Sequence, residues 1–121
     1  MERHYDAVSM TLGTTELLAA LTADDKSTRL KAALAIGSNP DPTLLDALMG
    51  RCALESDFYV RDMLTWALTR LPSMITVPRL LEELRSDTAQ ARSQALHTLS
   101  KIGDASAFPA ITRSTPARPR R

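Results

Sequence analysis

The sequence is poor in the residues that most often carry enzyme chemistry or covalent cross-links. It holds a single cysteine, Cys52, so no disulfide can form within the chain, and we expect a reducing compartment such as the cytoplasm. Only two histidines are present, His4 and His97. The four glycines lie far apart in the chain, which excludes a glycine-rich phosphate-binding loop.

Aromatic residues and long apolar runs are also scarce. Aromatics make up only 4% of the chain, so leucine, alanine, isoleucine and methionine must build the core. No stretch approaches the roughly 18 apolar residues of a membrane-spanning helix. The first ten residues lack a basic region followed by an apolar run, which argues against a signal peptide. The net charge of +1 creates no overall field that would attract nucleic acid or a membrane.

The residues that are abundant favour helices. Alanine and leucine are strong helix formers, and they outnumber the β-branched and aromatic residues that favour strands. The hydrophobic content of 44% is ordinary for a soluble globular protein. A chain of 121 residues is long enough for one domain with its own core. The composition therefore predicts a single all-α domain.

One pattern occurs three times along the chain, each time anchored on an arginine. Arg29, Arg61 and Arg92 are 32 and 31 residues apart, a spacing within the range of solenoid repeats. Apolar residues follow each arginine after three and seven residues, and in the last two copies also after ten, which places them on one face of a helix. These residues are Ala32 and Ile36, then Leu64, Leu68 and Leu71, then Ala95, Leu99 and Ile102. Each copy predicts a helix pair that must stack on its neighbours to bury its apolar face.

Residues 15–111 resemble the short bacterial HEAT repeats, a class also found in phycobilisome lyase proteins. KIGDASAFPAI, from Lys101 to Ile111, matches the pattern best, and TRLKAALAIG, from Thr28 to Gly37, is next. The middle copy departs from it, with Leu64 and Thr65 at the alanine pair and Pro72 at the glycine. The resemblance implies an all-α, right-handed α-solenoid of about three helix-pair repeats.

The two ends of the chain differ from the repeats. Residues 1–13 are predicted to form an N-terminal cap or flexible segment, and residues 14–111 the solenoid, in which a fourth repeat begins but is not completed. Residues 112–121, rich in proline and arginine, are predicted to be a disordered basic tail. We therefore expect a shortened form of a longer array, and the alternative is a three-repeat protein with a basic tail. An uncapped apolar end around Phe108 and Ile111 predicts self-association.

Local signals predict the helix ends and an electrostatic contact. Short oxygen-bearing side chains precede the arginine-bearing helices and are expected to cap them, among them Asp25 and Asp57. Prolines are expected in or beside the first turns of the other helices: Pro42, Pro78 and Pro109. The spacing from Asp25 to Arg29 and from Asp57 to Arg61 suits a ladder of ion pairs within or between repeats.

The candidate binding residues lie opposite the predicted core face of the arginine-bearing helices. In HEAT solenoids these helices line the concave surface, which is the usual binding face. Five residues after each arginine stand Leu34, Trp66 and His97, and Trp66 is flanked one turn away by Met63 and Arg70. Tryptophan and arginine are enriched at interaction hot spots, and methionine adapts to varied partners. The predicted partner-binding residues are Leu34, Met63, Trp66, Arg70, His97 and Lys101. The alternative is that Trp66 fills space between adjacent helices.

These observations predict a non-enzymatic scaffold that binds a protein partner on the concave face, with no cofactor and no metal. No metal-binding or catalytic motif is recognisable, and Cys52 is interpreted as a small core residue rather than a nucleophile. The alternative function is nucleic-acid binding through Lys31, Arg70, Lys101 and the arginine-rich tail, although three charges on the face are few for that purpose. An accessory subunit related to bilin-lyase HEAT proteins ranks lower, because nothing in the chain marks a chromophore pocket.

Overall fold

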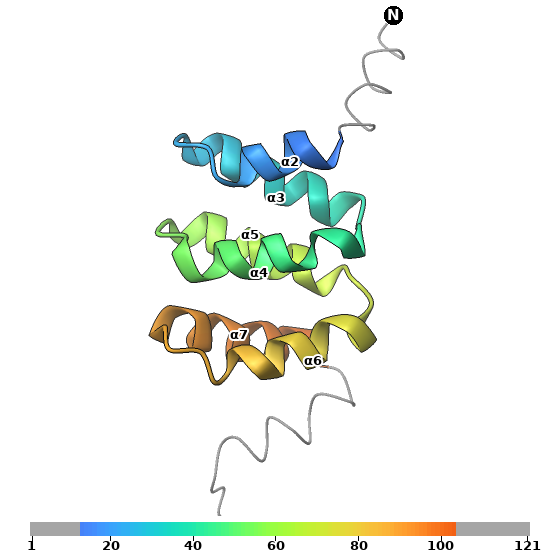
Figure 1. The fold of residues 1–121 in the computed structure, drawn as a ribbon, viewed down its shortest axis with the longest axis vertical. Coiled ribbons are helices and arrows are strands. Elements are labelled where there is room, and N and C mark those ends of the chain that lie inside the picture. The colour runs from blue at the N-terminus through green and yellow to red at the C-terminus, as the bar shows by residue number, and fades with distance from the viewer. Residues whose placement is uncertain (1–12, 104–121) are drawn as a thin grey trace, which may run out of the picture.

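The computed structural model describes residues 13–103, and all regular structure in this range is helical (Figure 1). The elements are α2 (Thr14–Leu21), α3 (Lys26–Ser38), the 3₁₀-helix η1 (Pro42–Leu44), α4 (Leu45–Leu54), α5 (Phe58–Thr69), α6 (Ser73–Glu83) and α7 (Ala89–Ile102). The predicted all-α class is confirmed. Within this range, none of these helices is long and apolar enough to cross a membrane.

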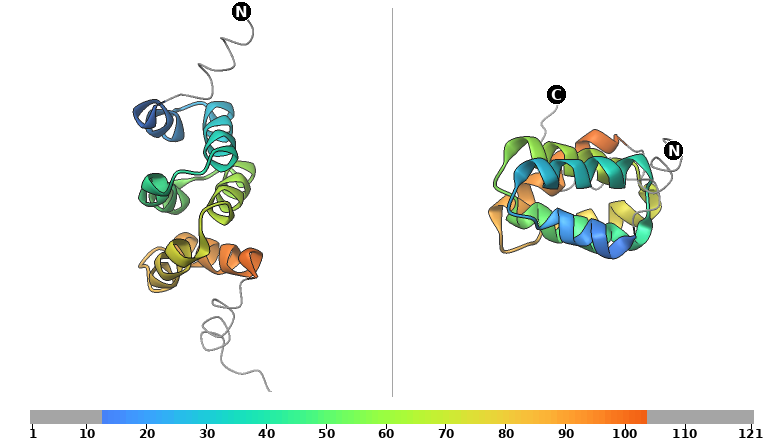
Figure 2. Two further views of the ribbon diagram at one scale, coloured as in Figure 1. Left: turned by 90° about the vertical axis from the view of Figure 1, so that its right-hand side faces the viewer. Right: turned by 90° about the horizontal axis from the view of Figure 1, so that it is seen from above.

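The helices form three stacked pairs. Helix α2 pairs with α3, α4 with α5, and α6 with α7, and the pairs follow one another along the long axis of the molecule (Figure 1). Seen from the side, the stack has two layers (Figure 2). One, here the A layer, contains α2, α4 and α6, and the other, here the B layer, contains the arginine-bearing helices α3, α5 and α7. This arrangement is the predicted solenoid of helix-pair repeats.

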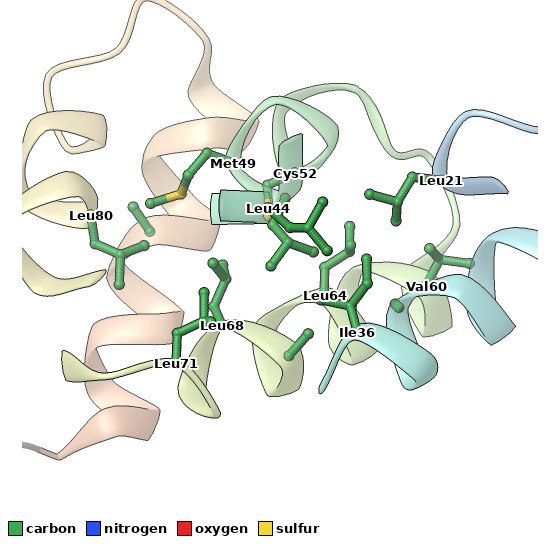
Figure 3. Close-up of a cluster of buried hydrophobic side chains, with 14 of the residues drawn as sticks. Leu21, Ile36, Leu44, Met49, Cys52, Val60, Leu64, Leu68, Leu71 and Leu80 are labelled. Atoms are coloured by element: carbon green, nitrogen blue, oxygen red, sulfur yellow. The ribbon is translucent and has the colours of Figure 1, made fainter. Parts of the chain in front are cut away.

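The predicted apolar face of the B-layer helices is the core of the stack. Leu64, Leu68 and Leu99 are fully buried, and Ile36 is almost so. Side chains from α3, η1, α4, α5 and α6 meet around Leu64 and Leu68 (Figure 3). Each leucine taken out of water in this way stabilises the fold by about 1.5–3 kcal/mol. The periodicity therefore located the core correctly.

Two of the predicted caps are present. Asp25 accepts a hydrogen bond from the Thr28 amide (3.0 Å), and Asp57 accepts one from the Val60 amide (2.9 Å). The expectation that Pro78 lies in or beside the first turn of a helix is wrong. Helix α6 begins at Ser73, ahead of the apolar run that had marked its start, so Pro78 lies in its interior.

The arginines that anchor the repeats do not pair with the aspartates four residues before them. Instead, the Nη1 atom of each one donates to the main chain of the preceding loop: Arg29 to Ala23 and Asp24, Arg61 to Glu55 and Ser56, and Arg92 to Ser86. The aspartates Asp25 and Asp57 are occupied as helix caps. Ion pairs between repeats exist, but they join Arg29 to Glu55, Lys26 to Asp57 and Arg79 to Asp46. The repeated arginine thus clamps the loop that connects the two helices of its own pair.

Several predictions concern parts of the chain outside residues 13–103. These are the N-terminal cap, the incomplete fourth repeat with Pro109, the self-associating end around Phe108 and Ile111, and the basic tail over residues 112–121. His4 also lies outside the described range.

Candidate functional site

The predicted binding residues lie on B-layer helices, except Arg70, which directly follows α5, and they differ in how far they are exposed to solvent. Leu34, Arg70, His97 and Lys101 are exposed, and Trp66 exposes 36% of its surface. Met63 differs from these, because it is half-buried and packs against the hydrophobic core. Gln94, which stands two residues after Arg92 as Met63 does after Arg61, is buried. In these two copies that position is at least half-buried, whereas Lys31, its equivalent in the first copy, is exposed.

Trp66 closes the contact between α3 and α5. Its ring lies against Gly37, where an added Cβ would stand 2.6 Å from Cε3 of the indole. The Nε atom of Arg70 donates to the Gly37 carbonyl (3.2 Å), and the guanidinium carbon lies 5.9 Å from the centre of the Trp66 ring. The alternative interpretation of Trp66, as a filler between adjacent helices, is thus correct for one face of the ring. Its exposed part remains on the B-layer surface.

The next contact in the B layer, between α5 and α7, carries different residues at the equivalent positions. His97 replaces Trp66, Lys101 replaces Arg70, and Thr69 replaces Gly37, each counted from its own arginine. A β-branched threonine does not permit the close approach that glycine allows. At this contact a groove of about 460 Å³ is open between the two helices. Its walls are Phe58, Arg61, Asp62 and Thr65 on one side, and Gln90, Ser93, Gln94, His97 and Lys101 on the other.

Polar side chains bridge α5 and α7 beneath this groove. The hydroxyls of Thr65 and Thr98 share a buried hydrogen bond of 2.8 Å. The side-chain amide of Gln94 donates to the Arg61 carbonyl (2.8 Å) and approaches the Thr65 hydroxyl (3.3 Å). Gln94 exposes only 8% of its surface, and its Oε1 accepts no hydrogen bond from residues 13–103. Leaving a buried acceptor unpaired costs about 1–3 kcal/mol.

Exposed aromatic side chains stand at one end of the groove, and sequence reasoning missed them. Phe58 and Tyr59 expose 63% and 70% of their surfaces, and their rings meet edge to face with centres 5.5 Å apart. Phe58 forms part of the groove wall. A signal was present, since two adjacent aromatics follow the helix cap Asp57 in a chain with few aromatics. Both residues precede Arg61, so they lie outside the pattern of positions after each arginine that predicted the binding residues.

The charges along the groove are predominantly positive. Arg61 and Lys101 are permanent cations, and Asp62 is the acidic residue of the lining. Part of the Arg61 guanidinium is occupied by the carbonyls of Glu55 and Ser56, at 3.1 and 3.0 Å. Among residues 13–103, Lys101 forms no ion pair. The end of the groove at His97 and Lys101 therefore offers a cation to a ligand.

A buried carboxylate holds the elements behind the groove in place. Glu55 is fully buried and accepts hydrogen bonds from Arg29 (2.8 and 3.0 Å), from Arg51 (3.0 Å) and from the Asp57 amide (3.0 Å). Burial alone would raise the pKa of Glu55, but these donors outweigh it and hold the pKa below its usual range. The Gln90 amide donates to the Glu55 carbonyl (2.6 Å) and so ties α7 to the same loop.

The groove is lined by polar and charged side chains that can bind a ligand. The thiol of Cys52, the one cysteine of the chain, is shielded from solvent. Cys52, buried in α4 as predicted, has its pKa raised to about 12 by burial and by the nearby carboxylates of Glu83 and Glu55. A thiol in this state is a poor nucleophile. Over the described range, no group of three or more histidine, cysteine or acidic side chains is arranged to hold a metal ion.

Comparison with known proteins agrees with this architecture. The family model described as HEAT repeats matches residues 14–91, which is more than half of the chain. The match is to HEAT repeats in general and does not specify the phycobilisome-lyase-like type. No curated protein sequence matches the chain. HEAT repeats commonly serve as scaffolds for protein interactions. On the evidence of this match and of its stacked helix pairs, the chain belongs to the HEAT-repeat family.

Proposed function

We propose that this chain is a non-enzymatic scaffold that binds a protein partner on the exposed surface of its B-layer helices. The surface comprises the predicted residues Leu34, Met63, Trp66, Arg70, His97 and Lys101, extended by the groove between α5 and α7. The observation that carries the proposal is this groove, which is open where the equivalent contact between α3 and α5 is closed. The common use of HEAT repeats as interaction scaffolds supports the same function.

The residue types on this surface favour a protein over a nucleic acid. Exposed aromatic side chains lie beside arginine and methionine, the combination that is enriched at protein interfaces. The exposed cations Lys31, Arg70 and Lys101 belong to three different repeats, and Asp62 lines the groove together with Lys101. A nucleic-acid surface usually neutralises more phosphates along a continuous path.

The test is affinity capture from a native lysate followed by binding measurements with the purified partner. A B-layer variant, Leu34→Glu with His97→Glu, is compared with an A-layer variant, Leu18→Glu with Met74→Glu. All four positions are exposed and both variants add two negative charges, so the two variants match in added charge. Equal helicity and equal unfolding temperature establish that both are folded.

We expect one protein to be captured by the wild type and by the A-layer variant, and to be lost from the B-layer variant. Purified partner should then bind the wild type directly, with affinity that survives nuclease treatment. Equal capture by both variants would contradict the proposed surface. Capture that disappears with nuclease and falls steeply with salt would instead favour the nucleic-acid alternative.

A further inference from the structure

The length of the groove limits how many residues of a bound segment it can contact. Its α7 wall runs from Gln90 to Lys101, a stretch that spans roughly 16 Å at about 1.5 Å per residue. An extended chain advances about 3.3 Å per residue, so about five residues would follow this length. The groove, of about 460 Å³ and open to solvent, can thus hold part of a short extended segment.

The two ends of the groove differ in chemistry. At the start of α5 lies the exposed ring of Phe58, backed by Tyr59, which offers an apolar surface. At the end of α7 lie His97 and Lys101, one helical turn apart on the same wall. Since no acidic side chain of the described range pairs with Lys101, this end favours a negatively charged group. A ligand that is apolar at one end and anionic at the other complements both.

The lining between the ends is polar, as an extended main chain requires. An extended segment carries unpaired N–H and C=O groups, and each costs free energy if it is buried without a partner. Ser93 and Gln94 line this part of the groove, together with Thr65 on the opposite wall. Gln94 Oε1 has no donor among residues 13–103, but it is closed to solvent. Ser93 is exposed, and its hydroxyl can donate to a peptide C=O or accept from a peptide N–H.

We propose that the groove between α5 and α7 binds a short extended segment of a partner protein, about five residues long, that carries a carboxylate. An apolar or aromatic side chain of the segment packs on Phe58, and the carboxylate lies between His97 and Lys101. The carboxylate belongs either to an acidic side chain or to the C-terminus of the partner. This inference rests on the proposed scaffold function and names the chemistry of its ligand.

The probe is an array of random hexapeptides, each made with a free and with an amidated C-terminus, incubated with the full-length chain. We expect the bound peptides to share an aspartate, a glutamate or a free C-terminus, separated by three or four residues from a leucine, isoleucine or aromatic residue. Loss of binding on amidation identifies the C-terminal carboxylate as the ligand group. Retention on amidation identifies an acidic side chain.

Three variants then test the site with the best peptide, by fluorescence anisotropy at physiological salt. Lys101→Glu should weaken binding about tenfold, and Phe58→Ser by a similar factor. Both positions are exposed, so neither variant should disturb the core. Met74→Ser, at a position that is 79% exposed on α6 in the A layer, is the control and should bind as the wild type does. A peptide whose acidic residue is replaced by lysine should recover affinity for Lys101→Glu.

The outcomes separate this inference from the proposed function. If no peptide binds, or if Lys101→Glu and Phe58→Ser bind the best peptide unchanged, the ligand assignment is wrong. A single-stranded oligonucleotide that displaces the peptide with equal affinity would also overturn it, because the groove would then recognise charge alone. If capture of a partner depends on Leu34 but not on Phe58 or Lys101, the scaffold function is supported and only the ligand proposed for the groove is wrong.

Discussion

The indole of Trp66 lies directly on the backbone of Gly37, and this contact sets how closely α3 and α5 approach. A Cβ on Gly37 would lie 2.6 Å from Cε3 and 3.0 Å from Cη2 of the ring. Arg70 completes the contact with a hydrogen bond to the Gly37 carbonyl (3.2 Å). One repeat further on, Thr69 and His97 hold the equivalent positions, and a groove is open instead.

Replacing Gly37 by alanine should destabilise the fold, although alanine is the better helix former. The added methyl group must displace the indole, and such overpacking costs about 1–3 kcal/mol. This exceeds the gain of about 0.5–1 kcal/mol that the alanine brings to a helix interior. We expect the urea midpoint to fall with little change in the m-value.

Two controls isolate the cause of that loss. Gly50 lies in α4, and a Cβ there would meet nothing within 4 Å, so Gly50→Ala should raise the free energy of unfolding by about 0.5–1 kcal/mol. In a Trp66→Ala background, Gly37→Ala should lose its cost. A cost that persists in this background would show that the contact with Trp66 is not its source.

Glu55→Gln should be among the most damaging substitutions that keep the shape of the side chain. It removes the charge that balances the buried guanidinium of Arg29 and that also binds Arg51. Removing one partner of a buried pair leaves the other unpaired, and we expect a loss of about 2–4 kcal/mol by urea unfolding. Asp46→Asn breaks an exposed pair with Arg79 and should change stability by less than about 0.5 kcal/mol. Equal losses in the two variants would contradict the role assigned to Glu55.

The free energy of unfolding should fall as the solution becomes acidic. The pKa of Glu55 is held below its ordinary value of 4.5, and that of Asp57 is lowered by the Val60 amide. A carboxylate whose pKa is lower in the folded state stabilises the fold above its unfolded pKa, and that contribution is lost as pH falls through the folded value. The loss should therefore begin near pH 4.5 and grow below it. In Glu55→Gln the pH dependence over this window should be shallower, and an unchanged slope would contradict the assignment.

Cys52 should react with thiol reagents only when the protein unfolds. Burial raises the pKa of the thiol to about 12, so almost no thiolate is present at pH 8. We expect labelling by an aromatic disulfide reagent to be slow and to speed up in the destabilised Gly37→Ala variant. Rapid labelling of the wild type at a rate independent of stability would show that Cys52 is reached by local opening.

Gln94→Met should change neither stability nor binding strongly. Methionine has nearly the same shape and removes the unpaired Oε1, while Thr65 keeps its hydrogen bond with Thr98. We expect the free energy of unfolding to change by less than about 1 kcal/mol, because the hydrogen bond from the side-chain amide to the Arg61 carbonyl and the unpaired acceptor are lost together. Affinity for a groove peptide should be retained, since Oε1 is closed to solvent. A loss of affinity without a loss of stability would show that Gln94 turns towards the ligand.

The sequence by itself determined the helices, their apolar faces and their stacking into repeats. These features depend on residues a few positions apart: the spacing that buries Leu64 and Leu68, and the side chains of Asp25 and Asp57 that cap the first turn of a helix. Their repetition at a constant period indicated the solenoid. The start of α6 was misplaced because Pro78 is tolerated within a packed helix.

Only the tertiary structure decided what the B-layer surface offers. The contact of Trp66 with Gly37, the pairing of Arg29 with Glu55 and the burial of Gln94 each join residues of different repeats. The groove is open where His97 and Lys101 hold the positions that Trp66 and Arg70 hold in the repeat before. Local periodicity assigns the same face to both sets of residues. Whether a gap is closed depends on the size of side chains that meet across two helices, which local periodicity does not determine.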